Sequence, residues 1–190
     1  MIEMHLGGLG FDPRNMSPII LLRDAEEKNF LPIWIGMFEA AAIAMELQDF
    51  KPPRPMTHDL LVGIIDILGG AVDRIVISDI KDDTFYSSID LIAPAGHINL
   101  ELLDGSILAD KELKENEDDP DTEIIRLDAR PSDAIAIAVR TNAPIFVSEQ
   151  VMFKAKMVNA EKDQEETKKF KEFIENINPE DFEKYYNQKQ

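Results

Sequence analysis

The sequence contains no cysteine among its 190 residues. Disulfide bonds and thiolate metal sites are therefore excluded, and a reducing compartment such as the cytoplasm is expected. The chain also lacks any apolar run near the roughly 20 residues that a membrane-spanning helix needs. Its first residues, Met1 to His5, do not follow the basic and then apolar order of a secretory signal peptide. We therefore expect a cytoplasmic protein without a membrane partner.

Basic residues are few: 20 lysines and arginines stand against 37 acidic residues, so the net charge is -17. Proteins that bind nucleic acid through its phosphates usually carry a basic patch, and this charge argues against tight binding of that kind. Much of the acid lies in residues 110–123 and in the segment after Glu161. Such runs are typical of solvated loops or helix faces, with acidic metal binding as the second interpretation.

Two phosphate-binding motifs are missing. The chain has no Gly-x-x-x-x-Gly-Lys loop and no Gly-x-Gly-x-x-Gly turn after a strand, so we expect no organic nucleotide cofactor. Ser132 also lacks the Gly-x-Ser-x-Gly surroundings of a hydrolase nucleophile. A Ser-His-Asp hydrolase is therefore disfavoured.

Hydrophobic periodicity predicts an α+β fold: a mixed, mostly antiparallel sheet packed with buried, Ala-rich helices, followed by a C-terminal helical tail. Short connections indicate that the first three strands form an antiparallel meander, and Pro32 favours either an edge position for the third strand or the end of that strand. A hairpin is expected over 97–108. The other strands are expected at 1–11, 17–23, 30–36, 71–80, 84–93, 123–127 and 144–147.

Helices are expected at 37–47, 58–68, 134–140 and 149–157, with a further amphipathic helix after Glu161. The helix after Gly36 is apolar on most sides, so we expect it to be buried. Thr57 is the expected N-cap of the next helix, and Pro131 suits the first turn of the third because its fixed φ fits a helix. The expected core face of the 58–68 helix consists of Leu60, Leu61, Ile64, Ile65 and Leu68.

Polar residues gather at the starts of three of these helices. The groups are Gly36 with Glu39, the run Arg54–Asp59, and the run Asp128–Ala134. Helix N-termini carry free N–H groups and a positive dipole end, so they attract carboxylates and phosphates alike. A structural interpretation stays open for each group. Asp59 and Asp133 can act as caps, His58 can be a structural hydrogen-bonding residue, and Glu39 with Arg130 can form one buried ion pair.

Four motifs, in this order, resemble the bifunctional nuclease domain family: residues 31–36 with Glu39-Ala40, residues 54–59, residues 128–134 and residues 143–147. The resemblance implies one α+β domain over residues 1–150, often oligomeric, with nuclease action on DNA and RNA in some members. Residues 95–122 depart from the compact family pattern and are interpreted as an acidic insertion. Residues 151–190 are interpreted as an acidic helical tail.

Two functional hypotheses follow. In the first, the protein is a metal-dependent phosphodiesterase that hydrolyses DNA and RNA with Mg²⁺ or Mn²⁺, since hard cations prefer carboxylate oxygens. In the second, it is a non-catalytic interaction or regulatory module whose polar motifs form an ion-pair and capping network. Nucleic acid is a weak partner in either case, and a homo-oligomer is expected. The first hypothesis assigns Glu39, Asp59 and Asp133 as catalytic residues and metal ligands, His58 as general base, and Arg54, Arg130, Thr57 and Ser132 as binding residues.

Overall fold

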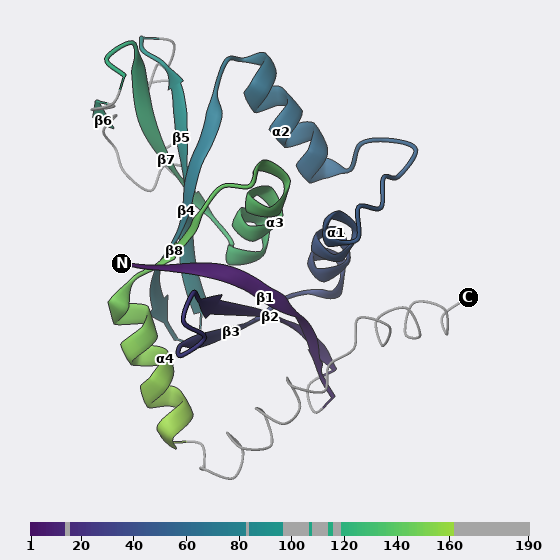
Figure 1. Ribbon diagram of the computed structural model, residues 1–190, viewed down its shortest axis with the longest axis vertical. Coiled ribbons are helices and arrows are strands. Elements are labelled where there is room, and N and C mark those ends of the chain that lie inside the picture. Colours follow the sequence, from purple (N-terminus) through teal and green to yellow (C-terminus); the bar gives the residue numbers. More distant parts are fainter. Residues whose placement is uncertain (14–15, 83, 97–106, 108–113, 116–118, 162–190) are drawn as a thin grey trace.

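The computed structural model describes residues 1–13, 16–82, 84–96, 107, 114–115 and 119–161 (Figure 1). These residues form an α+β fold, as the sequence predicts. The strands are β1 (Ile2–Asp12), β2 (Ser17–Asp24), β3 (Phe30–Trp34), β4 (Ala71–Lys81), β5 (Thr84–Pro94), β6 (Lys114–Glu115), β7 (Thr122–Ala129) and β8 (Ile145–Val147). The helices are α1 (Met37–Leu47), α2 (Thr57–Ile67), α3 (Pro131–Thr141) and α4 (Glu149–Glu161).

The strands form one mixed sheet in the order β3-β2-β1-β8-β4-β5-β7-β6. The short strand β8 lies in the middle, antiparallel to β1 and parallel to β4, while the other pairs are antiparallel. It joins an N-terminal meander to the β4–β7 half of the sheet, and both Ile145 and Val147 are buried. Among the described residues, the sheet is therefore completed by the strand that comes last in the chain.

The expected strands are confirmed where the structure describes them. The β1-β2-β3 meander is present, and Pro32 lies in β3, at the edge of the sheet. The tight turn between β4 and β5 includes Asp82 at a positive φ of 48°. The hairpin expected over 97–108 lies outside the described residues except for Ile107, and the helix expected after Glu161 also lies outside them.

Helix α3 forms the centre of the core, packed against α1, α2, β4 and β5. Pro131 is its first residue, with Arg130 as N-cap, and Asn142 ends it in a left-handed conformation at φ 55°. The five consecutive residues from Ala134 to Ala138 are all buried. Alanines alternate here with isoleucines, so the helix backbone can approach its neighbours while the larger side chains fill the core. The burial expected for this helix is confirmed.

The burial expected for the two preceding helices is partly wrong. In α1 the buried residues are Ala40, Ala42 and Ile43, whereas Phe38 and Leu47 are exposed. In α2 no residue is fully buried. The predicted core face of α2 is turned outward: Leu60, Leu61, Ile64 and Leu68 are exposed, and only Ile65 of that set is partly covered. Periodicity identifies residues that share a helix face, but it does not decide which face meets the protein.

Helix α4 packs against β4, and its residues Val151 and Met152 are buried. Lys154 Nζ donates to Asp79 Oδ1 at 2.7 Å and ties the same helix to the end of β4. Figure 1 shows α4 at the lower left of the picture, α3 near the centre, α2 at the top and α1 to the right. None of the helices within the described residues is long and apolar enough to span a membrane.

The burial pattern predicts that replacement of leucine by alanine lowers the free energy of unfolding by different amounts at two positions. Leu22 is completely buried in β2, and its replacement by alanine is expected to lower the free energy of unfolding by about 3 kcal/mol. Leu47 is half exposed at the end of α1, so Leu47→Ala is expected to cost less than about 1 kcal/mol. Urea unfolding of both variants measures the difference, and equal costs would contradict the packing described.

Candidate functional site

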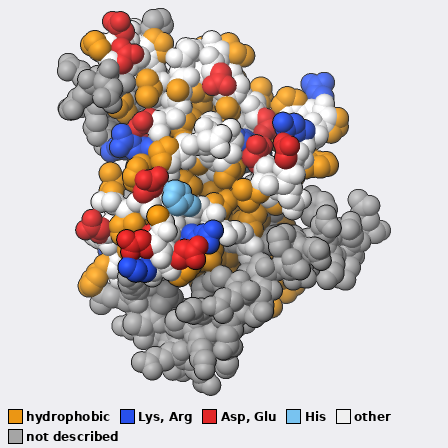
Figure 2. Space-filling model, in the orientation of Figure 1, with side chains coloured by type: hydrophobic (Ala, Val, Ile, Leu, Met, Phe, Trp, Pro, Cys, Tyr) orange, Lys and Arg blue, Asp and Glu red, His pale blue; other side chains and the backbone are white. Residues whose placement is uncertain are grey.

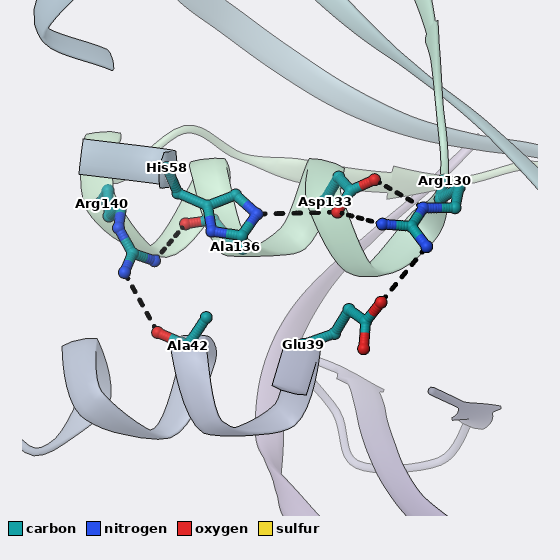
Figure 3. A network of polar contacts seen from close by, with 7 residues as sticks. All are labelled: Glu39, Ala42, His58, Arg130, Asp133, Ala136 and Arg140. Carbon is teal, nitrogen blue, oxygen red and sulfur yellow. Dashed lines mark hydrogen bonds and ion pairs between the residues drawn. The ribbon is translucent and has the colours of Figure 1, made fainter. Parts of the chain in front are cut away.

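The polar helix starts meet around Arg130. Its Nε and Nη2 atoms donate to the two carboxylate oxygens of Asp133 at 2.7 and 3.0 Å, in a bidentate pair. Its third nitrogen, Nη1, donates to Glu39 Oε1 at 3.2 Å. Figure 3 shows Glu39 reaching from the start of α1 toward Arg130 at the start of α3. The hydrogen bonding that Arg130 donates to Asp133 is the main reason that the pKa of Arg130 is raised above its ordinary value.

His58, in the first turn of α2, completes this group. Its Nε2 atom lies 3.6 Å from Asp133 Oδ1, on the side of the carboxylate away from the arginine (Figure 3). The imidazole is largely covered, with 16% of its side chain exposed. We call Glu39, His58, Arg130 and Asp133 the Arg130 cluster. It draws one or two residues from each of three helices.

The backbone at Gly36 also shapes the cluster. Gly36 is the N-cap of α1, and a Cβ atom at this position would collide with the Glu39 carboxylate. The absent side chain therefore leaves the space in which the Glu39 carboxylate lies. The sequence motif that joins Gly36 to Glu39 has this contact as its physical basis.

Asp59, the remaining predicted carboxylate, points elsewhere. Its Oδ1 accepts a hydrogen bond from Arg140 Nε at 2.6 Å, and its Oδ2 accepts one from the backbone N–H of Met56 at 2.7 Å. The hydrogen bond from Arg140 is the largest cause of a pKa of Asp59 below the ordinary 3.8. Asp59 thus closes the start of α2 and anchors that helix to α3.

Arg140 is the residue that sequence reasoning missed. Only 6% of its side chain is exposed, and besides Asp59 it donates to the carbonyl oxygens of Ala136 and Ala42 at 2.8 and 3.1 Å. Figure 3 shows it at the opposite end of α3 from Arg130, reaching toward α1. One guanidinium therefore joins α1, α2 and α3. The signal available in the sequence was an arginine at the end of an otherwise apolar helix, because a buried arginine needs a partner for its charge.

A buried carboxylate of the sheet was missed as well. Asp90 of β5 is almost fully buried and receives a bidentate pair from Arg126 of β7, with both distances 2.7 Å. Arg74 of β4 approaches the same carboxylate at 3.6 Å. This network crosses three neighbouring strands and is separate from the Arg130 cluster. Strand alternation could have placed the three side chains on one face only if the strand register had been known.

Several expectations for the binding residues need correction. Glu39 and Arg130 do form an ion pair, but it is not buried, since 68% of the Arg130 side chain is exposed. Thr57 is not the N-cap of α2: the cap is Met56, and Thr57 is the first helical residue and is exposed. Arg54 lies exposed on the connection before α2, away from the hydrogen bonds of the cluster, and Ser132 is buried in the first turn of α3.

The donor set does not fit the metal site expected from the sequence. Glu39 and Asp133 share Arg130, and Asp59 is bound to Arg140. Within the described part of the chain, no three His, Asp or Glu side chains are grouped so that they could hold a metal ion. A divalent ion at this place would need Arg130 to leave the two carboxylates.

Charge on the visible surface is mixed. Figure 2 shows basic side chains in separate places, most of them beside acidic ones, rather than in a continuous basic stripe across that face. A ligand with negative charge would therefore meet single cations such as Arg130 instead of an extended basic groove.

The two arginines of α3 give a first test of these assignments. Arg140→Ala leaves Asp59 and two carbonyl oxygens without their buried donor, so a loss of about 3–5 kcal/mol in the free energy of unfolding is expected. Arg130→Ala removes an exposed pair and is expected to cost at most about 1 kcal/mol. Urea unfolding at pH 7 compares them. A larger cost for Arg130→Ala would contradict the structural role given to Arg140.

The lowered pKa of Asp59 predicts a pH dependence of stability. A carboxyl whose pKa is depressed by folding stabilises the protein above its unfolded value, and this contribution is lost as the pH falls through its folded value. The stability difference between the wild type and Asp59→Asn should therefore be constant above about pH 5 and shrink as the pH falls below the ordinary 3.8. Asp66→Asn, at an exposed position of the same helix, is the matched control. A difference that stays constant down to the acid limit would contradict the pairing.

Comparison with known proteins adds to this geometry. Residues 20–160 match the family model of the bifunctional nuclease domain. An uncharacterized protein of Mycobacterium tuberculosis is 35% identical over 191 residues, which cover 96% of this chain and 98% of that protein. A protein of Oryza sativa subsp. indica described as bifunctional nuclease 1 is 27% identical over 135 residues, 71% of this chain but 34% of the rice protein. The matched region includes all four residues of the Arg130 cluster.

Proposed function

The chain belongs to the bifunctional nuclease domain family, and from this premise we propose that it hydrolyses phosphodiester bonds of DNA and RNA at the Arg130 cluster. The observation that carries the proposal is the placement of a mostly exposed guanidinium beside Asp133, which a largely covered histidine also approaches. The family supports nuclease-like function in general. The choice of residues, and action on both nucleic acids, are our proposal.

Arg130 is the proposed phosphate-binding residue. Asp133 and Glu39 hold its guanidinium in place, and its high exposure lets a phosphate approach the same group. A planar guanidinium can bind two phosphoryl oxygens at once and offsets the negative charge that develops on them. Arg54, exposed on the connection before α2, is proposed to contact a neighbouring phosphate.

His58 is the proposed general base. Its imidazole would accept a proton from a water molecule as the water oxygen bonds to phosphorus, and Asp133 would stabilise the imidazolium formed. The bond from phosphorus to the leaving sugar oxygen then breaks, and that oxygen takes a proton from the imidazolium. Glu39 touches Arg130 and acts as a positioning residue.

Metal dependence stays a prediction. The carboxylates expected as ligands are bound to arginines, so we derive no step through a metal ion. Metal-independent and metal-dependent cleavage differ in one measurable way. Cleavage by the Arg130 cluster with its ion pairs intact would persist in the presence of a chelator. Cleavage that requires Mg²⁺ or Mn²⁺ would instead mean that Glu39 and Asp133 exchange Arg130 for the cation.

A second candidate function, a non-catalytic interaction module, is favoured by a specific observation. Each charged side chain of the cluster already has a partner of opposite charge, and the net charge of -17 opposes contact with a polyanion. In this case the three helix starts serve only to hold α1, α2 and α3 together.

Cleavage of labelled single-stranded DNA and RNA by the purified full-length chain separates the two functions. The assay is run at about 50 mM salt, because the binding of phosphates weakens as the salt concentration rises. We expect His58→Ala to lose at least about 100-fold in the single-turnover rate, as removal of a general base does. Parallel reactions with EDTA, Mg²⁺ and Mn²⁺ measure the metal requirement.

The control for His58→Ala is His5→Ala, which removes an exposed histidine of β1 outside the cluster. Both variants are purified in the same way, so a contaminating nuclease would give them equal rates. Full activity in His58→Ala would remove the proposed base. Absence of cleavage in the wild type under every condition would favour the interaction module.

A further inference from the structure

The first turn of α1 carries an aromatic ring that the protein leaves uncovered. Phe38 is 85% exposed, and no other phenylalanine, tyrosine or tryptophan within the described residues is more exposed. Ala41 and Met45, which follow it at helical spacing, are partly covered, so the exposure is confined to the start of the helix. A single exposed apolar residue is ordinary on a protein surface. What distinguishes Phe38 is its place beside the Arg130 cluster.

Phe38 directly precedes Glu39, the residue that joins α1 to this cluster. Glu39 Oε1 accepts a hydrogen bond from Arg130 Nη1 at 3.2 Å, and Figure 3 shows the Glu39 side chain reaching toward the start of α3. Consecutive residues of a helix lie about 3.8 Å apart at Cα, and their side chains point about 100° apart. The Phe38 ring therefore projects beside the Glu39 carboxylate, and 68% of the Arg130 side chain remains exposed next to it.

We propose that Phe38 stacks on an unpaired base of the nucleic acid whose phosphate binds Arg130. The inference rests on the function proposed above and names the substrate class of the same site, which is single-stranded nucleic acid. In a nucleotide the sugar separates the base from the phosphate, so two neighbouring groups of different chemistry are needed to bind both. Arg130 offers positive charge to the phosphate, and Phe38 offers an apolar face to the base. Proteins that bind single strands combine these two kinds of contact.

The preference for an unpaired base has a physical reason. A base in a duplex is stacked between its neighbours and paired with its partner, so it can reach a side chain only after unstacking and unpairing. A protein partner is a poorer occupant, because the residues that anchor protein interfaces lie in well-packed pockets and not on one isolated ring. Stacking also needs no positive charge from the protein. It can therefore add affinity for a strand although the net charge of -17 opposes contact with phosphates.

Equilibrium binding of two labelled strands to the full-length chain tests the contact. One strand is an oligothymidylate, and the other has the same length but stable abasic residues in place of the thymidines. Every variant is made in a His58→Ala background, so that the strands stay intact during the measurement. We expect Phe38→Ala to raise the dissociation constant of the oligothymidylate by at least about 5-fold, the lower end of base–aromatic stacking, and to leave that of the abasic strand unchanged.

Phe153→Ala is the matched control, because Phe153 is a phenylalanine of α4 that is 66% exposed and lies outside the Arg130 cluster. It should bind both strands like the parent protein. Phe38→Trp should keep the preference for the strand with bases, since an indole ring also stacks on them. Equal weakening of both strands by Phe38→Ala would mean that the ring does not act through the base, and it would overturn the proposal. An unchanged dissociation constant for the oligothymidylate would overturn it as well.

Salt separates the contribution of the ring from that of the guanidinium. The logarithm of the affinity falls with the logarithm of the salt concentration, in proportion to the number of phosphates that the protein neutralises. Arg130→Ala should therefore reduce this slope. Phe38→Ala should lower the affinity for the oligothymidylate at every salt concentration and leave the slope unchanged. A reduced slope in Phe38→Ala would contradict an uncharged contact with the base.

Cleavage by the protein with His58 in place relates the contact to the proposed function. The wild type should cleave a single strand faster than the duplex of the same sequence, and Phe38→Ala should reduce that preference when the substrate is below saturation. Base-dependent binding through Phe38 in a chain that cleaves no substrate would remove the proposed hydrolysis and leave the base contact in place. Cleavage that is the same in the wild type and Phe38→Ala for both substrates would remove the base contact and leave the hydrolysis in place.

Discussion

The hydrogen bonds of Arg140 are the interaction on which the arrangement of the helices depends. This one buried guanidinium contacts a carboxylate of α2 and carbonyl oxygens of α1 and α3. It lies at the end of α3 opposite to Arg130 (Figure 3). A buried cation is costly unless each of its donors is satisfied, so its three partners cannot move apart independently. The fixed distances among the helix starts follow from this constraint.

The Arg130 cluster depends on those distances. Glu39, His58 and Asp133 come from three different helices, so their separation depends on how α1, α2 and α3 pack together. Helix α3 has an arginine at each end: Arg130 is its N-cap and Arg140 lies in its last turn. The buried one determines the structure, and the exposed one is available to a ligand. Arg140 is buried whereas Arg130 is exposed, and we assign them different roles for this reason.

Much of the fold could be predicted because its signals are local. Pro131 and the alternating alanines and isoleucines that follow it define α3, and Pro32 places β3 at the sheet edge. The face of α2 that packs against the protein could not be predicted. Leu60 and Val62 are equally apolar, and only tertiary packing decides which of them faces α3. The partners of Asp59 and Asp90 also required the fold. Each is bound by an arginine 81 or 36 residues away in the chain.

The meeting of the polar helix starts was predicted better than the contacts within the group they form. Glu39, His58, Arg130 and Asp133 do come together, as three polar helix starts suggested, but Asp59 belongs to the structural junction. We propose that the Arg130 cluster hydrolyses phosphodiesters in addition to holding the helix starts together. Asp133→Asn is the decisive variant, because it keeps the side-chain shape and removes the charge beside His58. We expect a single-turnover cleavage rate at least about 100-fold lower in the folded variant; an unchanged rate would refute the proposal.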